Sequence, residues 1–273
     1  MPTNLKKLCI HTITTKPWEI EQSSEAFSAA GIGGITVWRQ ALEGRDIVKT
    51  GDRLRNDGLE VVSLCRGGFF PATSASQRKL NIDDNLKALD EAAALGAPLI
   101  VLVCGADPDQ SLVTSRDQIR AGLEVILPRA EELNVKLAIE PLHPMYAASR
   151  SAINTMSQAN DMAETINSPY VGVAVDVYHL WWDPNLENEI IRCGQNDHLF
   201  AFHICDWKFP LVDFLNDRGL MGEGCIDVPG IRRWVEKAGF DGFNEVEIFS
   251  ERFWAMDQHD FLTKIIDAYE HHS

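Results

Sequence analysis

Four short apolar runs in the second half of the chain each end on an acidic residue or a histidine, namely Glu140, Asp176, His203 and Glu247. Pro141 directly follows the first of these runs and prevents the strand from continuing. Carboxylates at the ends of buried strands suit a core badly. They suit the mouth of a parallel barrel, where the carboxyl ends of the strands meet. The pattern therefore predicts one site assembled from four strands.

A strand-then-helix alternation runs through the whole chain, without a Pro/Gly/Ser-rich linker or low-complexity segment. The predicted strands are 5–12, 34–38, 60–65, 98–104, 135–140, 170–176, 199–204 and 243–249. The predicted helices are 19–30, 46–56, 75–95, 115–133, 151–167, 185–193, 227–238 and 253–270. A doubly wound sheet is the competing architecture, but its G-x-G-x-x-G fingerprint is missing after the first strand. We predict a single-domain α/β protein, a (β/α)8 TIM barrel over residues 1–273.

The charge balance limits the classes of partner. A formal net charge of −15 argues against nucleic acid and anionic membrane surfaces, which both require a basic footprint. A few local Arg or Lys side chains are still enough to hold a phosphorylated small molecule. No apolar run approaches the roughly 20 residues that span a membrane. The first residues lack the apolar segment of a signal peptide, so a cytoplasmic location with reduced cysteines is expected.

The residue types at the four strand ends point to a metal. Three carboxylates and one imidazole suit a divalent ion of intermediate hardness, with Mn²⁺ first and Mg²⁺, Co²⁺ or Zn²⁺ as alternatives. The competing interpretation treats each residue as an isolated polar side chain that solvent satisfies, which four matching positions disfavour. Glu245 shares a strand face with Glu247 because side chains alternate in a strand, so the fourth ligand is ambiguous from spacing alone.

Five segments carry a resemblance to a known family: residues 138–142, 175–179, 202–206, 221–227 and 239–249. They resemble the xylose isomerase-like superfamily of sugar isomerases and epimerases. That superfamily includes tagatose 3-epimerases, inosose isomerases and dehydratases, and hydroxypyruvate isomerases. The matching motifs span the second half of the chain. The first half agrees in its alternation and in the polar strand ends His11, Trp38 and Arg66, which the resemblance makes candidates for substrate contact.

The resemblance implies roles for the strand-end residues. Glu140, Asp176, His203 and Glu247 would bind the metal, and the motif position favours Glu247 over Glu245. In epimerase members the two glutamates exchange protons on opposite faces of the substrate carbon. The chemistry agrees, because a metal that holds a carbonyl acidifies the neighbouring proton and stabilises an enediolate. One carboxylate can then abstract the proton and the other can return it.

Two histidines follow these strand ends. His179 lies in an Asp-x-x-His pattern that in the family places the histidine on a substrate oxygen, and a packed loop histidine is the alternative. His143 follows Glu140 by three residues, where a histidine can act as a general base. A hydrogen-bonded loop histidine between two prolines is an equally good interpretation of His143.

One family feature is missing. Epimerase members carry an arginine six residues after the seventh-strand histidine, and this chain has Phe209 there. Lys208, Arg218 or Arg150 are candidates to supply the cation. The long segment 207–223 is expected to form a lid over the site.

The function predicted from these features is a metal-dependent isomerase or epimerase of a keto-sugar or polyhydroxy ketone. A lyase on the same scaffold, either an inosose-type dehydratase or a 3-keto-glycoside deglycosidase, is the main alternative. An endonuclease IV-like nuclease would need histidines at the third and fourth strand ends, where this chain has Cys65 and Cys104. A non-catalytic sugar-binding barrel would not need two facing carboxylates. The partner is a small sugar or polyol, and family members are often dimers or tetramers, which makes a homo-oligomer an open option.

Overall fold

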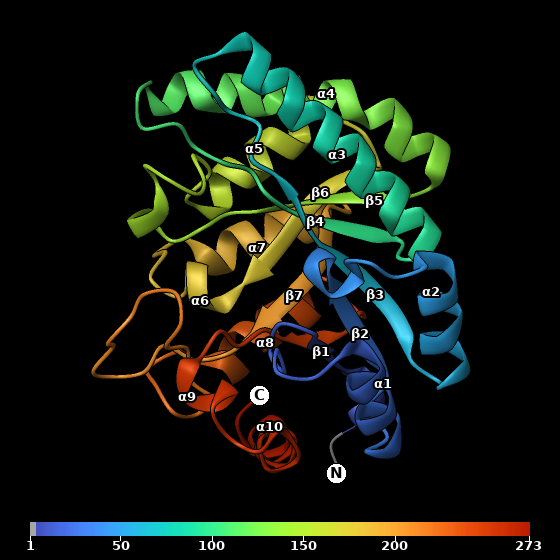
Figure 1. The fold of residues 1–273 in the computed structure, drawn as a ribbon. Helices are drawn as coiled ribbons and strands as arrows, with labels where there is room; N and C mark the ends of the chain where they lie inside the picture. Colours follow the sequence, from blue (N-terminus) through green and yellow to red (C-terminus); the bar gives the residue numbers. More distant parts are fainter. Residues whose placement is uncertain (1–3) are drawn as a thin grey trace.

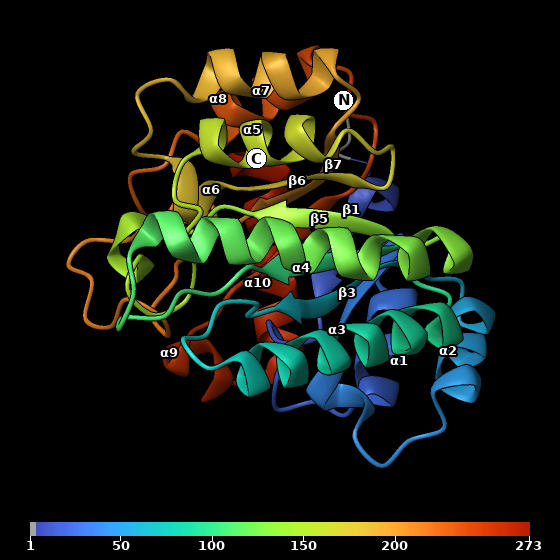
Figure 2. The ribbon, with the colours of Figure 1, turned by 90° about the horizontal axis from the view of Figure 1, so that it is seen from above.

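The computed structural model describes residues 4–273, so residues 1–3 of the predicted domain lie outside the described part. Eight parallel strands form one closed barrel in chain order, and β8 pairs with β1 to close it. Helices surround the strands on the outside (Figures 1 and 2). The predicted single-domain (β/α)8 TIM barrel is confirmed.

The strands are short and almost entirely buried, as expected for parallel strands that are covered on both faces. Their bounds are β1 Leu8–His11, β2 Gly34–Trp38, β3 Glu60–Gly68, β4 Leu99–Val103, β5 Lys136–Glu140, β6 Val171–Asp176, β7 Leu199–Ile204 and β8 Asn244–Val246. β3 runs beyond its predicted end at residue 65 because Gly67 and Gly68 still pair with β4 after a register shift. β8 is shorter than predicted and stops at Val246.

The helices follow the predicted alternation, with differences at several element ends and one additional short helix, α6. The α-helices are α1 Ile20–Ala29, α2 Ile47–Asn56, α3 Ala75–Leu95, α4 Leu112–Leu133, α5 Met156–Ile166, α6 Val177–Leu180, α7 Leu186–Gln195, α8 Val228–Lys237, α9 Glu251–Trp254 and α10 Gln258–His272. Short 3₁₀ segments are η1 Leu5–Lys7, η2 Arg39–Leu42 and η3 Pro144–Tyr146. η1 replaces the start of the first predicted strand, and Thr155 delays α5 because its side chain caps the helix. Asp257 caps α10, which divides the predicted last helix in two.

The apolar core has two parts. The larger part lies between the strands and the surrounding helices, and a smaller cluster lies inside the barrel. The inner cluster contains Ala138, Ala174 and Ala201, which precede Glu140, Asp176 and His203 by two residues each. Residues two apart in a strand share a face, so these polar side chains lie above a layer of small residues inside the barrel.

None of the helices described for residues 4–273 combines the length and apolar character that crossing a bilayer requires.

Candidate metal centre and active site

The strand ends bring the four predicted ligands together. One ligand atom from each of Glu140, Asp176, His203 and Glu247 lies within 4.8 Å of the others, and all four side chains are buried. The Nδ1 atom of His203 is 3.0 Å from Oε1 of Glu140. Three carboxylates and an imidazole nitrogen at this spacing fit a single divalent cation that accepts mixed oxygen and nitrogen ligands.

The charges in this cluster are unbalanced. Arg218 is the cation in direct contact with it, since its Nη1 lies 2.7 Å from Oε2 of Glu247 and 3.3 Å from Oδ2 of Asp176. Burial and the neighbouring carboxylates raise the pKa of Asp176, although Arg218 opposes the shift. The pKa of Glu247 is lowered despite burial, because Arg218 and the two nearby histidines favour its charged form. A bound cation would relieve the remaining repulsion.

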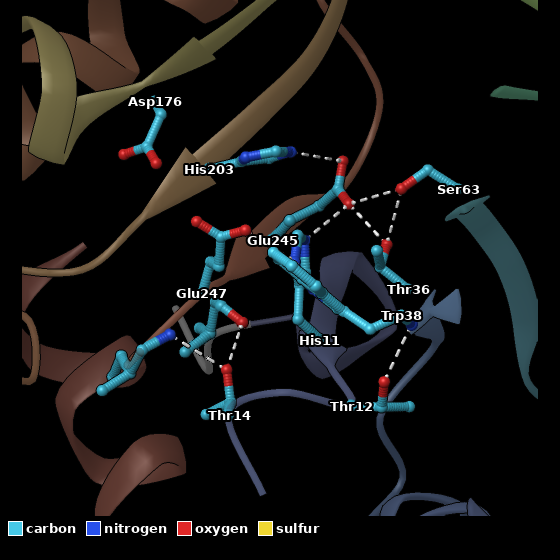
Figure 3. A network of polar contacts seen from close by, with 12 residues as sticks. His11, Thr12, Thr14, Thr36, Trp38, Ser63, Asp176, His203, Glu245 and Glu247 are labelled. Carbon is cyan, nitrogen blue, oxygen red and sulfur yellow. Dashed lines mark hydrogen bonds and ion pairs between the residues drawn. The ribbon is translucent and has the colours of Figure 1, made fainter. Parts of the chain in front are cut away.

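A second polar layer lies beside this cluster on the same barrel face (Figure 3). Glu245 is its centre, and its Oε2 lies 3.1 Å from Nε2 of His11. Thr36 Oγ1 donates to the same oxygen at 2.6 Å and Ser63 Oγ donates at 3.4 Å. Burial raises the pKa of Glu245, but His11, His203 and Thr36 outweigh it and lower the pKa overall.

His11 joins the two layers. Its Nε2 faces Glu245, and its Nδ1 lies 3.2 Å from Oε1 of Glu247. Trp38 Nε1 also approaches Nδ1, at 3.3 Å. Burial lowers the pKa of His11, but the two glutamates raise it to about 9 overall. Both His11 and Trp38 are buried, and the structure places these two predicted substrate contacts next to Glu247, which His11 contacts directly.

The second layer was not anticipated as a unit. Thr36 and Ser63 are buried polar residues in otherwise apolar strands, which is the signal that was available in the sequence. Cys65 also approaches, since its Sγ, a His11 nitrogen and a Glu247 oxygen lie within 4.8 Å of one another. Burial and Glu247 raise the pKa of Cys65, which keeps it a thiol. His11, His203 and Glu245 form a further group at metal-ligand spacing.

His179 and Arg218 border the cluster on the side of β6. His179 Nε2 lies 3.3 Å from Nη2 of Arg218 and 3.6 Å from Oδ2 of Asp176. Burial, followed by the charge of Arg218, lowers the pKa of His179, which keeps the ring neutral. His179 Nδ1 and Arg218 Nε are buried and have no hydrogen-bond partner in the described chain. Buried polar atoms are normally paired, so both are available to a bound polar ligand.

His143 stands in an aromatic wall. Its ring centroid lies 5.2 Å from that of Trp207 and 5.7 Å from that of Trp182. The ring of Tyr178 stacks on that of Trp207, with the ring centroids 4.9 Å apart. His143 Nδ1 accepts from the backbone of Met145, and burial lowers the pKa of His143. The ring is therefore a neutral imidazole near the end of β5.

The predicted cations have different environments. Arg218 contacts the carboxylates directly, whereas Lys208 pairs with Asp217 at 2.5 Å. Arg66 stacks on the ring of Phe69, with its Cζ 4.2 Å from the centroid. Among the candidates for the missing family cation, Arg218 is the one that the structure brings to the cluster.

The long segment after β7 is tied to the barrel by residues that the sequence reasoning did not single out. Asp206 accepts hydrogen bonds from the backbones of Trp207, Gly222, Gly224 and Ile226 at 2.8–3.0 Å. The hydroxyl groups of Tyr146 and Tyr178 both donate to the backbone oxygen of Phe214, at 2.7 and 2.8 Å. Two short helical segments, η3 after β5 and α6 after β6, thus hold the predicted lid at Phe214.

Comparison with known proteins agrees with this architecture. The family model described as a xylose isomerase-like TIM barrel matches residues 25–265. An inosose isomerase from Bacillus licheniformis is 28% identical over 137 residues, which is 49% of this chain and 47% of that protein. The chain thus spans about half the length of this relative. An inosose isomerase from Bacillus velezensis is 22% identical over 268 residues, covering 92% of this chain and 91% of the relative.

Solved structures show the same fold. Protein SMc04130 from Sinorhizobium meliloti 1021 superimposes with a TM-score of 0.94 at 44% identity, covering 97% of this chain and 98% of that one. The IOLI protein with a bound zinc atom gives a TM-score of 0.83 at 20% identity, covering 96% of each chain. A D-psicose 3-epimerase determined with D-fructose gives 0.78 at 16% identity, again covering 96% of each chain.

Proposed function

The chain belongs to the xylose isomerase-like TIM-barrel family, and from this premise we propose that it is a divalent-metal-dependent isomerase or epimerase of a keto-sugar or polyhydroxy ketone. The observation that carries the proposal is the convergence of Glu140, Asp176, His203 and Glu247 within 4.8 Å. Relatives named as inosose isomerases and a neighbour named as a D-psicose 3-epimerase support a substrate of this class.

The four residues would hold the metal. A divalent ion bound there would polarise a carbonyl and an adjacent hydroxyl, and would thereby acidify the proton on the carbon that carries this hydroxyl. We favour Mn²⁺ because the donor set contains three carboxylates and one imidazole. The zinc atom in the IOLI neighbour makes Zn²⁺ the first ion to compare with it.

Glu140 and Glu247 are the proposed proton-transfer pair. They come from β5 and from the end of β8, which are not adjacent in the barrel, so they approach the site from different sides. Neighbours fix both carboxylates: His203 contacts Glu140, while His11 and Arg218 contact Glu247. One carboxylate would take the proton from the substrate carbon and the other would deliver a proton to it.

His179 and Arg218 are the proposed substrate-oxygen contacts. Each has a buried polar atom without a partner in the described chain, and both border the carboxylates. His11 and Trp38 would shape the wall of the site, and Lys208 would act from the lid, where it pairs with Asp217. Arg66 is proposed to contact a more distant part of the substrate.

One observation supports a lyase as the second candidate. His143 is neutral and half-buried beside Trp207, and such an imidazole can serve as an additional base or acid. A reaction that removes a proton beside a carbonyl and then expels a β-substituent needs an acid for the leaving group. In a dehydratase or a 3-keto-glycoside deglycosidase, neutral His143 would take the proton from the carbon beside the carbonyl, and the imidazolium formed in that step would return a proton to the departing β-substituent.

Proton NMR in D₂O tests the proposal. The metal-loaded protein is incubated with keto-sugars, inososes and 3-keto-glycosides, and the α-hydrogen and the products are followed. Deuterium incorporation with an isomeric product supports the isomerase or epimerase. Exchange with release of water or an aglycone moves the assignment to the lyase. If no member of the panel exchanges and added Mn²⁺ or Zn²⁺ does not bind, the proposed function is wrong.

A further inference from the structure

Two arginines at the barrel mouth have no counter-charge. Arg66 follows Cys65 in β3, and Arg150 follows η3 in the loop after β5. Within residues 4–273, neither guanidinium makes an ion pair or a hydrogen bond. Arg233 shares this property, but it lies exposed on the outer helix α8. Arg66 and Arg150 are both partly buried, so water solvates their charges less than that of Arg233.

Aromatic rings hold the two side chains in place. The Cζ of Arg66 lies 4.2 Å from the centroid of the Phe69 ring, and that of Arg150 lies 5.7 Å from the Tyr146 ring. Phe69 and Tyr146 pack in the same small apolar cluster, beside Leu142. A guanidinium that rests on a ring by its face keeps its N–H donors directed away from the ring. Both groups therefore retain free donors at one side of the mouth.

The backbone beneath them is fixed. Gly105, after β4, donates its N–H to the carbonyl of Arg150 at 2.9 Å. Phe70, after β3, donates its N–H to the carbonyl of Cys104, after β4, at 3.0 Å. The loops after β3, β4 and β5 are therefore joined by main-chain hydrogen bonds, so the positions of the two arginines are set by the barrel and not by mobile segments.

The two cations repel each other. Burial and the charge of Arg150 both lower the pKa of Arg66. Asp84 is the carboxylate that opposes this shift, but Arg39 already binds both of its oxygens at 2.9 Å. An anion bound between the two arginines would relieve this repulsion.

The pair borders the proposed active site. The Tyr146 ring, which supports Arg150, lies with its centroid 5.8 Å from that of His179. Cys65, which precedes Arg66, places its Sγ within 4.8 Å of a Glu247 oxygen and a His11 nitrogen. A molecule whose reacting carbons lie at the carboxylates would therefore extend toward the arginines with its far end.

We propose that Arg66 and Arg150 form an anion subsite that binds a carboxylate or phosphate group at the far end of the substrate. The substrate would then be a keto-sugar acid or a keto-sugar phosphate, and this part rests on the proposed function. Arginine suits the task because its planar fork of N–H donors matches the oxygens of either group. The charged end group would fix the distance between the anion and the reacting carbonyl, and thereby select the substrate.

Anion binding tests the subsite independently of turnover. Isothermal titration calorimetry measures the affinity for inorganic phosphate and for acetate at constant ionic strength, with and without Mn²⁺. The proteins are the wild type, R66Q, R150Q, the double variant and R233Q as the matched control, and circular dichroism checks folding. The double variant should bind the preferred anion at least about tenfold more weakly, because it lacks both groups of charged N–H donors. R233Q should match the wild type. Equal affinity in the wild type and the double variant overturns the subsite.

Turnover then separates the two proposals. The ratio of kcat/KM for a ketose phosphate or ketose acid to that for the parent ketose should exceed one in the wild type. It should fall in R66Q and R150Q and stay constant in R233Q. A ratio of one or less in the wild type, with isomerase activity present, overturns the anionic substrate and leaves the isomerase. Arginine-dependent anion binding without exchange of any substrate supports the subsite and counts against the proposed reaction.

Discussion

Glu245 lies in β8 and Glu247 directly follows the end of that strand; both side chains are buried, yet their surroundings differ. Glu245 accepts hydrogen bonds from Thr36 and Ser63 and faces His11, so its charge is matched by donors. Glu247 faces Asp176 and Glu140 at metal-ligand distance. Burial is thus common to both glutamates, and cations contact both; Glu247 differs because it also lies among two further carboxylates at metal-ligand spacing.

The two layers therefore have different tasks. A buried polar network in which every member is satisfied stabilises and orders the structure around it. A group of carboxylates that repel one another is stable in a folded protein only when a cation or a proton joins it. We infer that the Glu245 layer supports the barrel interior and that the Glu247 layer binds the ion and the substrate.

The largest effect is expected on turnover. Glu140→Gln and Glu247→Gln each remove a proposed proton-transfer group, and each should reduce kcat by about 10²–10⁴-fold. Glu245→Gln should reduce kcat far less, because its carboxylate faces the supporting network. Steady-state assays with the substrate found in the NMR panel measure the three values. An equal loss in all three variants would remove the distinction between the layers.

The stability losses of the two variants should rank in the opposite order to their losses of turnover, with Glu245→Gln affected more than Glu247→Gln. Glu245→Gln leaves His11 without one of its charged partners, and breaking such a buried pair costs about 3–5 kcal/mol. Glu247→Gln removes a partner of Arg218 and of His11, but it also removes the repulsion between Glu247 and Asp176, so we expect the chelated protein to lose less stability. Urea unfolding of both variants in EDTA gives the comparison. A larger loss for Glu247→Gln would contradict it.

A bound metal ion should stabilise the wild type through the Glu247 layer alone. A divalent ion at a concentration 100 times its Kd raises the free energy of unfolding by about 2.7 kcal/mol. Glu245→Gln should keep most of this gain, whereas Glu247→Gln should lose it because a ligand is missing. Thermal unfolding at a series of Mn²⁺ and Zn²⁺ concentrations measures the effect. A gain that survives in Glu247→Gln but disappears in Glu245→Gln would place the ion in the other layer.

The pH dependence of the chelated protein follows from the histidines. Burial lowers the pKa of His11 and of His203, but the adjacent glutamates raise each to about 9, against an ordinary value of 6.5. A raised histidine pKa contributes stability that is complete below pH 6.5 and is lost as the pH rises through 9. The free energy of unfolding should therefore fall between these values. Chemical denaturation at several pH values measures this change. A free energy of unfolding that rises toward pH 9 would contradict the prediction.

The smallest effect concerns the lid. Tyr146 and Tyr178 donate to the same oxygen of Phe214, so either hydroxyl can hold the segment when the other is removed. Tyr178→Phe and Tyr146→Phe should each cost about 1 kcal/mol or less in stability and raise KM only slightly. The double variant should raise KM by more than the product of the two single effects. Strict additivity in the steady-state assays would show that the shared contact does not hold the lid.

Much of the fold was predictable because parallel barrel strands are buried on both faces and therefore appear as separate apolar runs. The same runs predicted that Glu140, Asp176 and His203 lie at the ends of strands, and the structure confirms these positions. α6 was missed because Val177–Leu180 is a single turn and too short to show a helical period. β3 was cut short because its glycines suggested a turn, although they continue to pair with β4.

The details of the site depended on contacts that local patterns do not contain. Arg218 reaches Asp176 from 42 residues away, through a loop whose path the sequence does not define. The choice between Glu245 and Glu247 depends on which side chains face them from β1, β2 and β3. The proximity of Arg66 and Arg150 arises because the loops after β3 and β5 both pair with residues that follow β4.

The position of the bound ion tests the central claim most directly. A crystal soaked in Mn²⁺ and measured at a wavelength with strong manganese anomalous scattering locates the ion without reference to turnover. We predict one strong peak among Glu140, Asp176, Nδ1 of His203 and Glu247. A peak between His11, Glu245 and Nε2 of His203, or no peak in protein that binds Mn²⁺ in solution, would contradict it.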